Sequence, residues 1–394
     1  MTDIYTKMEK KLDEKGSLSG KKVVIQPNMS MKNLPTEAGS KALEGFTALE
    51  TATVINRFQK AGGTIAGSSR IAEFAFGLNE DTTASILTEK TVDCAFMTDT
   101  LGEASHTAQT AAMYGFKPTY GIVSRFGLIG LIPSMETFGI IAESTEIIVA
   151  IMKEICGLDN KDVSMSDNQI PDFSKIDLVN HGISTAGIPA GYSEMLDEKE
   201  RKIFLESVEN IKSAGIAVKE IPFPAYRMFQ TVHFIIGCVE ASSACGKYDS
   251  VRYGHRAKNG DNWNEMYINS RKESFRTLLK TYLFQGAYFQ FENYESFEKA
   301  AKVRTYLAKE TAQLFEKVDV IISPVKRAKY NTGTTKTIDA IYNAFALTLP
   351  ANVLGCPTLS LPITGKSSEQ NPGLQIMGKP YSDVALLSWA ATIL

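Results

Sequence analysis

The sequence predicts an α/β fold in which a sheet with parallel strands is covered by helices. Apolar runs short enough for strands alternate with stretches of helical periodicity from the N-terminal part onward. Of the 394 residues, 44% are hydrophobic and 22% are charged, which is ordinary for a globular protein. No internal repeat or low-complexity linker divides the chain. We therefore expect one large domain spanning residues 1–394.

The N-terminal elements predict a strand, a helix and a second strand. Lys22–Ile25 is a short apolar run after a glycine-containing turn and predicts a buried strand. Ala48–Ala61 has helical periodicity and is stopped by Gly62 and Gly63. Thr64–Gly67 then predicts the next strand, and this spacing is typical of parallel pairing.

The remaining elements follow from the same patterns. Asp197–Ala214 predicts an amphipathic helix with Asp197 as its N-cap, and Gly215 ends it. The other expected elements are a helix over Thr145–Cys156, a strand and turn within Ile176–Pro189, a strand over Ala217–Ile221, several packed helices within Asn264–Ala312 and a strand over Val318–Pro324.

Composition argues against several classes of function. A net charge of −2 gives no global positive field that would collect nucleic acid. No apolar run is long enough for a membrane span. The five cysteines form no CxxC pair, which fits reduced thiols in the cytoplasm. The four histidines lack metal-ligand spacing, and no GxGxxG is present, so we expect neither a metal nor another cofactor.

The most unusual segment is the polar stretch that follows the apolar residues before Asp99. A loop there could present Asp99, Thr100 and Glu103 to a ligand. Residue types alone favour the start of a helix, with Asp99 or Thr100 as the cap and Glu103 stabilised by the helix dipole.

Five segments of the chain, taken together and in this order, resemble one known family. They are Gly115–Gly127 (GFKPTYG followed by VSRFG), Glu240–Arg256 (EASS followed by YDSVRYGHR), Phe315–Ile321, Leu349–Pro357 and Gly373–Pro380. The chain resembles the amidase-signature family, and within it the A subunits of the glutamyl-tRNA(Gln)/aspartyl-tRNA(Asn) amidotransferases. The resemblance implies a mixed, mostly parallel central sheet with helices on both faces, trimmed at its periphery.

The same resemblance implies that the catalytic residues have been replaced. The family hydrolyses amides with a Ser-cisSer-Lys triad, and backbone N–H groups of a glycine-rich turn hold the oxyanion. Here Gln26 matches the lysine, Asn79 the bridging serine and Glu103 the nucleophile, while Leu101 matches the first glycine of the turn. Glutamine cannot accept a proton at physiological pH. A carboxylate at position 103 would repel the developing negative charge.

Of the two matched substrate-binding positions, one keeps the residue type of the family and the other does not. Arg252 matches the arginine that holds the substrate carboxylate, and Phe345 falls on or near the aspartate that holds its ammonium group. Arg252 would either bind a small ligand or form an ion pair with Asp249 or Asp99. The candidate ligand-binding residues are Arg252, Asp99, Thr100, Glu103 and Phe345.

Two functions remain open at this point. The first is an inactive amidase-like protein that binds a protein partner, a second copy of itself or a small molecule. It predicts that side chains such as Phe345 and Leu101 fill the former pocket.

The alternative is an enzyme with a rebuilt site, in which Glu103, Glu80 and Asp99 cluster as general acids or bases. It predicts an open pocket lined by Glu103 and Arg252. Cys94 or Ser105 would then be a displaced nucleophile, although a cysteine in an apolar run such as that around Cys94 is more often inert.

Overall fold

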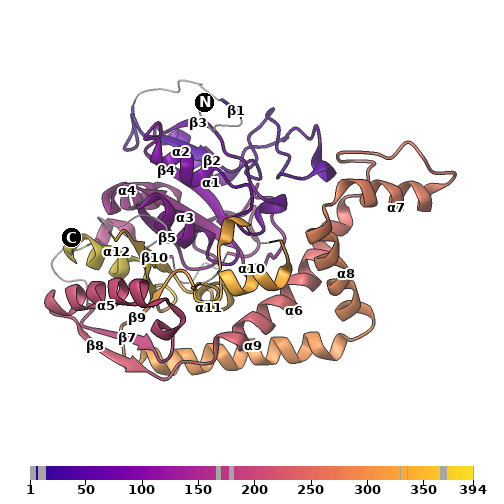
Figure 1. Cartoon of the computed structure of the whole chain (residues 1–394). Helices are drawn as coiled ribbons and strands as arrows, with labels where there is room; N and C mark the ends of the chain where they lie inside the picture. Colours follow the sequence, from indigo (N-terminus) through magenta and orange to yellow (C-terminus); the bar gives the residue numbers. More distant parts are fainter. Residues whose placement is uncertain are drawn as a thin grey trace.

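The computed structural model describes residues 6–7, 15–165, 170–176, 182–328, 330–334, 336–363 and 371–393. Its strands form one sheet in the order β1-β3-β2-β4-β6-β5-β10-β11-β9-β7-β8 (Figure 1). The strands are β1 (Thr6–Lys7), β2 (Lys22–Ile25), β3 (Thr64–Ser68), β4 (Cys94–Asp99), β5 (Tyr114–Lys117), β6 (Thr137–Ala142), β7 (Thr185–Pro189), β8 (Ala217–Ile221), β9 (Val320–Pro324), β10 (Thr358–Leu361) and β11 (Leu374–Gly378). Residues 177–181 of the segment expected to hold a strand and turn lie outside the described residues.

The sheet is mixed, as expected, but parallel pairing is confined to two runs. β2 pairs in parallel with β3 and β4, and β7 pairs in parallel with β8 and β9. The other pairings in the described part of the sheet are antiparallel. The expectation of a mostly parallel sheet is therefore wrong for its middle. A strand–helix–strand unit does occur there, from β4 through the helix Glu103–Ala111 to β5, but β6 inserts between these two strands and pairs antiparallel with both. Residues 118–136 join β5 to β6 without a helix.

Helices cover both faces of the sheet, which confirms the α/β class. They are α1 (Thr53–Lys60), α2 (Thr83–Thr88), α3 (Glu103–Ala111), α4 (Thr145–Ile155), α5 (Glu198–Ser213), α6 (Tyr226–Ala244), α7 (Trp263–Ser274), α8 (Thr277–Phe291), α9 (Tyr294–Phe315), α10 (Ile338–Ala344), α11 (Leu349–Leu354) and α12 (Asp383–Ile393). Side chains alternate along β2: Val23 and Ile25 join a core cluster with α1 and α4, whereas Val24 joins one with α2 and α3.

Most predicted helix ends are close to those of the structure. Asp197 caps α5 through a full capping box with Glu200. Helix α1 is shorter than the predicted Ala48–Ala61, because the chain is still extended at Ala52. The N–H of Ala52 donates instead to the carbonyl of Ser30, at 2.8 Å.

The helices predicted within Asn264–Ala312 are α7, α8 and α9, which confirms several packed helices. Helices α6, α8 and α9 share one core cluster, with Ile236, Tyr282 and Leu307 among its buried members. Figure 1 shows α7 at the end of an arm that α6 and α8 extend away from the sheet. Within the described residues, no helix is both long and apolar enough to cross a membrane.

Candidate functional site

The candidate site lies where β2 and β4 end side by side. The two strands pair in parallel, so the residues that follow them meet at one edge of the sheet. Gln26 follows β2 directly, and the turn from Asp99 to Glu103 follows the body of β4. The N–H of Thr98 donates to Gln26 Oε1 at 2.8 Å. The structure therefore brings Gln26 to the turn that ends at Glu103, as the resemblance implies.

The side chain of Gln26 is buried and bound at both ends. Besides accepting from Thr98, it donates through Nε2 to Asp81 Oδ2 at 3.0 Å. Burial raises the pKa of Asp81 to about 6, although hydrogen bonds from Thr83 and Gln26 oppose the shift. Gln26 thus ties the loop that contains Asp81 to the sheet. Sequence reasoning missed Asp81, because nothing in its local pattern separates it from other loop acids.

The carboxyl group of Glu103 accepts three backbone hydrogen bonds. Its Oε2 accepts from the N–H groups of Thr100 and Leu101, both at 2.7 Å, and its Oε1 accepts from Gly77 at 3.2 Å. The residue is 1% exposed. Two of the donors belong to the turn that the resemblance matches to the oxyanion-binding turn. The side chain of Glu103 therefore accepts hydrogen bonds from two backbone N–H groups of its own turn.

Asp99 holds the turn in shape. It accepts from the N–H groups of Gly102 at 3.1 Å and Ala104 at 2.8 Å. The N-cap residue of α3 is Gly102, not Asp99 or Thr100 as predicted, although the Asp99 side chain bonds the N–H of Ala104 in the first turn of the helix. Asn352 donates to Asp99 Oδ1 at 2.7 Å through Nδ2. Asn352 lies in one of the matched segments, but no local pattern connects it with Asp99.

The two carboxyl groups are protonated more readily than usual. Burial raises the pKa of Glu103 to about 8, and the negative charge of Asp99 adds to the shift. Backbone hydrogen bonds to Glu103 oppose it. Burial also raises the pKa of Asp99, with opposition mainly from the charge of the buried Lys117. The raised pKa values favour the neutral form of both carboxyl groups relative to exposed carboxylates.

Apolar side chains close over the turn. Leu101 and Phe345 are fully buried, and the ring of Phe345 meets the ring of His106 edge-on, with 4.6 Å between centroids. Burial lowers the pKa of His106 to about 3, so this imidazole is neutral. Thr348 donates to the carbonyl of Leu101 at 2.8 Å. Phe345 thus packs against α3 as a core residue.

A buried chain of hydrogen bonds supports the turn from the helical layer. His233 Nε2 lies 3.0 Å from the carbonyl of Thr100, which can only accept, so Nε2 carries the proton. His233 Nδ1 then accepts from the hydroxyl of Tyr342 at 2.8 Å, and Tyr282 donates to Tyr342 at 2.9 Å. None of these residues stood out in the sequence, since each lies in an apolar helical stretch.

Other predicted residues lie elsewhere. Glu80 is exposed and pairs with Arg276 at 2.9 Å, so the predicted cluster of Glu80 with Glu103 and Asp99 does not form. Arg252 is exposed and pairs with Asp249 at 3.3 Å, which is one of the two roles expected for it. The structure therefore does not bring Arg252 to Glu103.

The remaining candidates have structural surroundings. Asn79 is half-buried and lines a cavity with Phe76, Arg276 and other residues. Cys94 is buried in β4, and burial raises the pKa of its thiol. Ser105 donates to Gln375 Oε1 at 2.9 Å. The described residues contain no group of three or more His, Cys, Asp or Glu side chains that could hold a metal ion.

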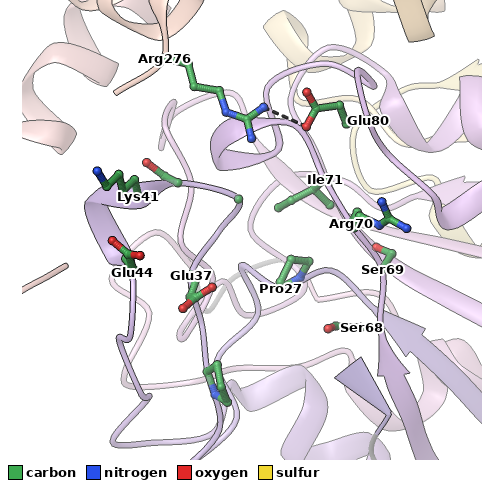
Figure 2. Close-up of a pocket in the computed structure, with 13 residues that line it drawn as sticks. Pro27, Glu37, Lys41, Glu44, Ser68, Ser69, Arg70, Ile71, Glu80 and Arg276 are labelled. Atoms are coloured by element: carbon green, nitrogen blue, oxygen red, sulfur yellow. Dashed lines mark hydrogen bonds and ion pairs between the residues drawn. The ribbon is translucent and has the colours of Figure 1, made fainter. Parts of the chain in front are cut away.

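An open cavity of about 310 Å³ lies beside the carboxyl ends of β2 and β3 (Figure 2). Figure 2 shows Arg276, at the start of α8, reaching toward Glu80 on one side of it. The lining residues are Pro27, Pro35, Glu37, Gly39, Ser40, Lys41, Glu44, Ser68, Ser69, Arg70, Ile71, Glu80 and Arg276. Gln26 and Glu103 do not line it, so this cavity opens beside the candidate site.

Comparison with known proteins identifies the family. The sequence matches the family described as Amidase over residues 3–102 and 83–387. The chain belongs to the amidase family. It is 31% identical to the A subunit of the glutamyl-tRNA(Gln) amidotransferase of Pediococcus pentosaceus over 405 aligned positions, which cover 94% of this chain and 83% of the relative. The corresponding protein of Fusobacterium nucleatum is 30% identical over 416 positions, covering 97% and 85%. These relatives confirm the resemblance seen in the sequence.

Solved structures of amidase-family proteins share the fold. The A subunit of the glutamyl-tRNA(Gln) amidotransferase of Thermotoga maritima superposes with a TM-score of 0.80 at 23% identity, covering 100% of this chain and 86% of that one. A 6-aminohexanoate cyclic dimer hydrolase superposes with a TM-score of 0.78 at 17% identity, covering 96% and 85%. The roles assigned to Gln26, Asn79 and Glu103 remain predictions.

Proposed function

We propose that this amidase-family chain does not hydrolyse amides and acts by binding a partner protein. The observation that carries the proposal is the position of Glu103, whose carboxyl group accepts the N–H groups of Thr100, Leu101 and Gly77. Stabilisation of an oxyanion requires such donors to be free and aimed at the substrate. In this chain the Glu103 carboxyl group already accepts hydrogen bonds from these donors.

The position matched to the catalytic base supports the same function. Gln26 has no group that accepts a proton at neutral pH, and its amide is bound to Thr98 and Asp81. Acyl transfer by a serine needs a base within hydrogen-bond reach. Neither the family's lysine nor a serine stands at the matched positions, which are Gln26, Asn79 and Glu103.

The kind of binding follows from the relatives. Their names describe them as subunits of an amidotransferase, so this fold forms part of an assembly there. For the present chain we propose a protein partner, with a second copy of the chain as the other candidate, and a cytoplasmic location. The exposed Arg252 is paired with Asp249, so it does not by itself support the binding of a small ligand.

One observation favours the alternative of a rebuilt enzyme. A carboxyl group whose pKa is raised to about 8, as in Glu103, is suited to general acid catalysis. Geometry weighs against it, since Glu103 is 1% exposed and Leu101 and Phe345 are fully buried around the turn. Glu80, which the alternative places in the cluster, is at the surface.

The two functions are separated by an assay of ammonia release. The purified chain is incubated with glutamine, asparagine and a panel of small primary amides, with an active family amidase in parallel. We expect no release above the buffer rate. Glu103→Ala should behave identically, as should Glu80→Ala, the matched substitution of an exposed carboxylate. Turnover by the natural chain that Glu103→Ala abolishes and Glu80→Ala retains would show that Glu103 is catalytic.

A further inference from the structure

Helix α8 is apolar on two opposite sides, and one of these sides is uncovered. Its inner side packs against α6 so closely that a Cβ at Gly286 would lie 1.8 Å from the carbonyl oxygen of Cys238. Its outer side carries Phe284, Tyr288 and Phe291, which are 75%, 52% and 74% exposed. These positions are four and three residues apart, so the three rings form one stripe along the helix. Exposed apolar patches of this kind mark interaction sites in soluble proteins.

A groove between α7 and α8 continues this stripe. Its volume is about 450 Å³, and Phe284 forms part of its wall. The lining residues are Ser242, Tyr267, Ile268, Arg271, Lys272, Phe275, Lys280, Leu283, Phe284 and Ala287. Most of them are apolar, and the charged ones are all basic.

Two of the groove's three basic residues, Arg271 and Lys280, are hydrogen-bonded to backbone carbonyls and keep their positive charges. The guanidinium of Arg271 is taken by the carbonyls of Cys245 and Tyr248, at 2.8 and 3.3 Å. Lys280 donates to the carbonyl of Lys272 at 3.1 Å, which places the Lys280 ammonium group near α7. Within the described part of the chain, neither lysine forms an ion pair. The groove therefore has an apolar floor and a positive rim, in which Glu73 opposes the charge of Lys280.

We propose that the groove between α7 and α8 binds an amphipathic helix of a partner protein, whose apolar face is flanked by aspartate or glutamate. This inference rests on the proposed function, since it names the surface by which the chain binds a partner. A helix laid in an apolar groove is anchored by residues spaced i, i+4 and i+7, and acidic flanks would pair with Lys272 and Lys280.

The same features disfavour other occupants. A second copy meeting the groove across a twofold axis would bring the lysine rims of both copies together, and like charges repel. Nucleic acid needs several cations along its backbone, whereas the lining of the groove has three basic residues, Arg271, Lys272 and Lys280. The aliphatic walls formed by Ile268 and Leu283 suit leucine-like anchors better than stacked bases.

The test uses a displayed library of helical 16-residue peptides, selected on the full chain. Enriched peptides should carry large apolar residues at i, i+4 and i+7 with acidic neighbours. Their affinity should fall about tenfold or more for Phe284→Ala and for Lys272→Glu. Leu49→Ala and Lys199→Glu, matched substitutions of exposed residues elsewhere, should leave it unchanged. Unfolding curves confirm that all four variants remain folded.

Three results would overturn the inference. The first is a selection that yields no peptides, yields basic ones, or yields peptides that bind Phe284→Ala as well as the natural chain. The second is a concentration-dependent dimer that Phe284→Ala abolishes, which would make a second copy the occupant. The third is binding of a labelled single-stranded oligonucleotide to the natural chain that Lys272→Glu abolishes. The ammonia assay on the same preparations reports separately on the proposed function, so failure of the groove leaves that proposal standing.

Discussion

The turn at Asp99–Glu103 and the groove between α7 and α8 differ in almost every physical respect. In the turn, the polar groups of Asp99 and Glu103 are buried and bound to backbone N–H groups and to Asn352. In the groove, Phe284 and Ile268 are exposed, and the charged lining residues are all basic. The turn is satisfied from within the chain, whereas the groove lacks a partner.

Under the proposed function, this difference separates an architecture that the chain keeps from a catalytic site that it lacks. The strands that would carry catalytic groups still end at one edge of the sheet, but Gln26 and Glu103 now bind the chain's own backbone. Buried polar groups that find partners inside the protein contribute to stability. The same proposal assigns the binding of other molecules to an exposed surface such as that of α8.

Substitution of one phenylalanine in each region should give the largest contrast. Phe345→Ala removes a fully buried ring beside His106 and should lower the free energy of unfolding by about 3–5 kcal/mol. Phe284→Ala removes a ring that is 75% exposed and should change it by less than about 0.5 kcal/mol. Urea unfolding of both variants measures the contrast. Equal losses would mean that Phe284 is covered in solution.

Substitution of one aspartate in each region should give a smaller contrast. Asp99→Ala leaves the N–H groups of Gly102 and Ala104 without their acceptor and removes one of three acceptors of the Asn352 amide. It should cost about 2–4 kcal/mol of stability. The matched control, Asp249→Ala, removes the partner of the exposed Arg252 and should cost about 1 kcal/mol or less. A larger loss of stability in Asp249→Ala than in Asp99→Ala would mean that Asp99 does not hold the turn.

The third effect depends on pH and is confined to the turn. Because the pKa of Glu103 is raised from 4.5 to about 8 on folding, the folded chain keeps a proton that the unfolded chain has released. The natural chain should therefore lose stability relative to Glu103→Gln as pH rises from about 5 to 8, and the difference should level off above that. Unfolding free energies of both proteins across this range test the sign. A difference that moves the other way would mean that hydrogen bonds to Glu103 outweigh its burial.

Local signals in the sequence were enough to predict much of the fold. β2, β3 and α5 lie close to their predicted bounds, because short apolar runs, glycine stops and the Asp197 cap act within a few residues. The antiparallel middle of the sheet was not predictable in this way, since pairing between β5 and β6 depends on a loop without a helical pattern.

The candidate site was predictable only in part. The resemblance located Gln26 and Glu103, and the spacing suggested that Asp99 caps a helix. Neither the resemblance nor the spacing could show that the Glu103 carboxyl group accepts from the N–H groups of Thr100 and Gly77. Nor could they show that Gln26 donates to Asp81. These contacts depend on how residues far apart in the chain are brought together by tertiary packing.

The most direct test of the account is a pair of crystal structures, with and without a high concentration of glutamine. The account predicts that the Glu103 carboxyl group contacts the N–H groups of Thr100, Leu101 and Gly77 in both, with no ligand at the turn. A structure in which Glu103 has swung away, and a glutamine carbonyl oxygen accepts those N–H groups, would contradict it.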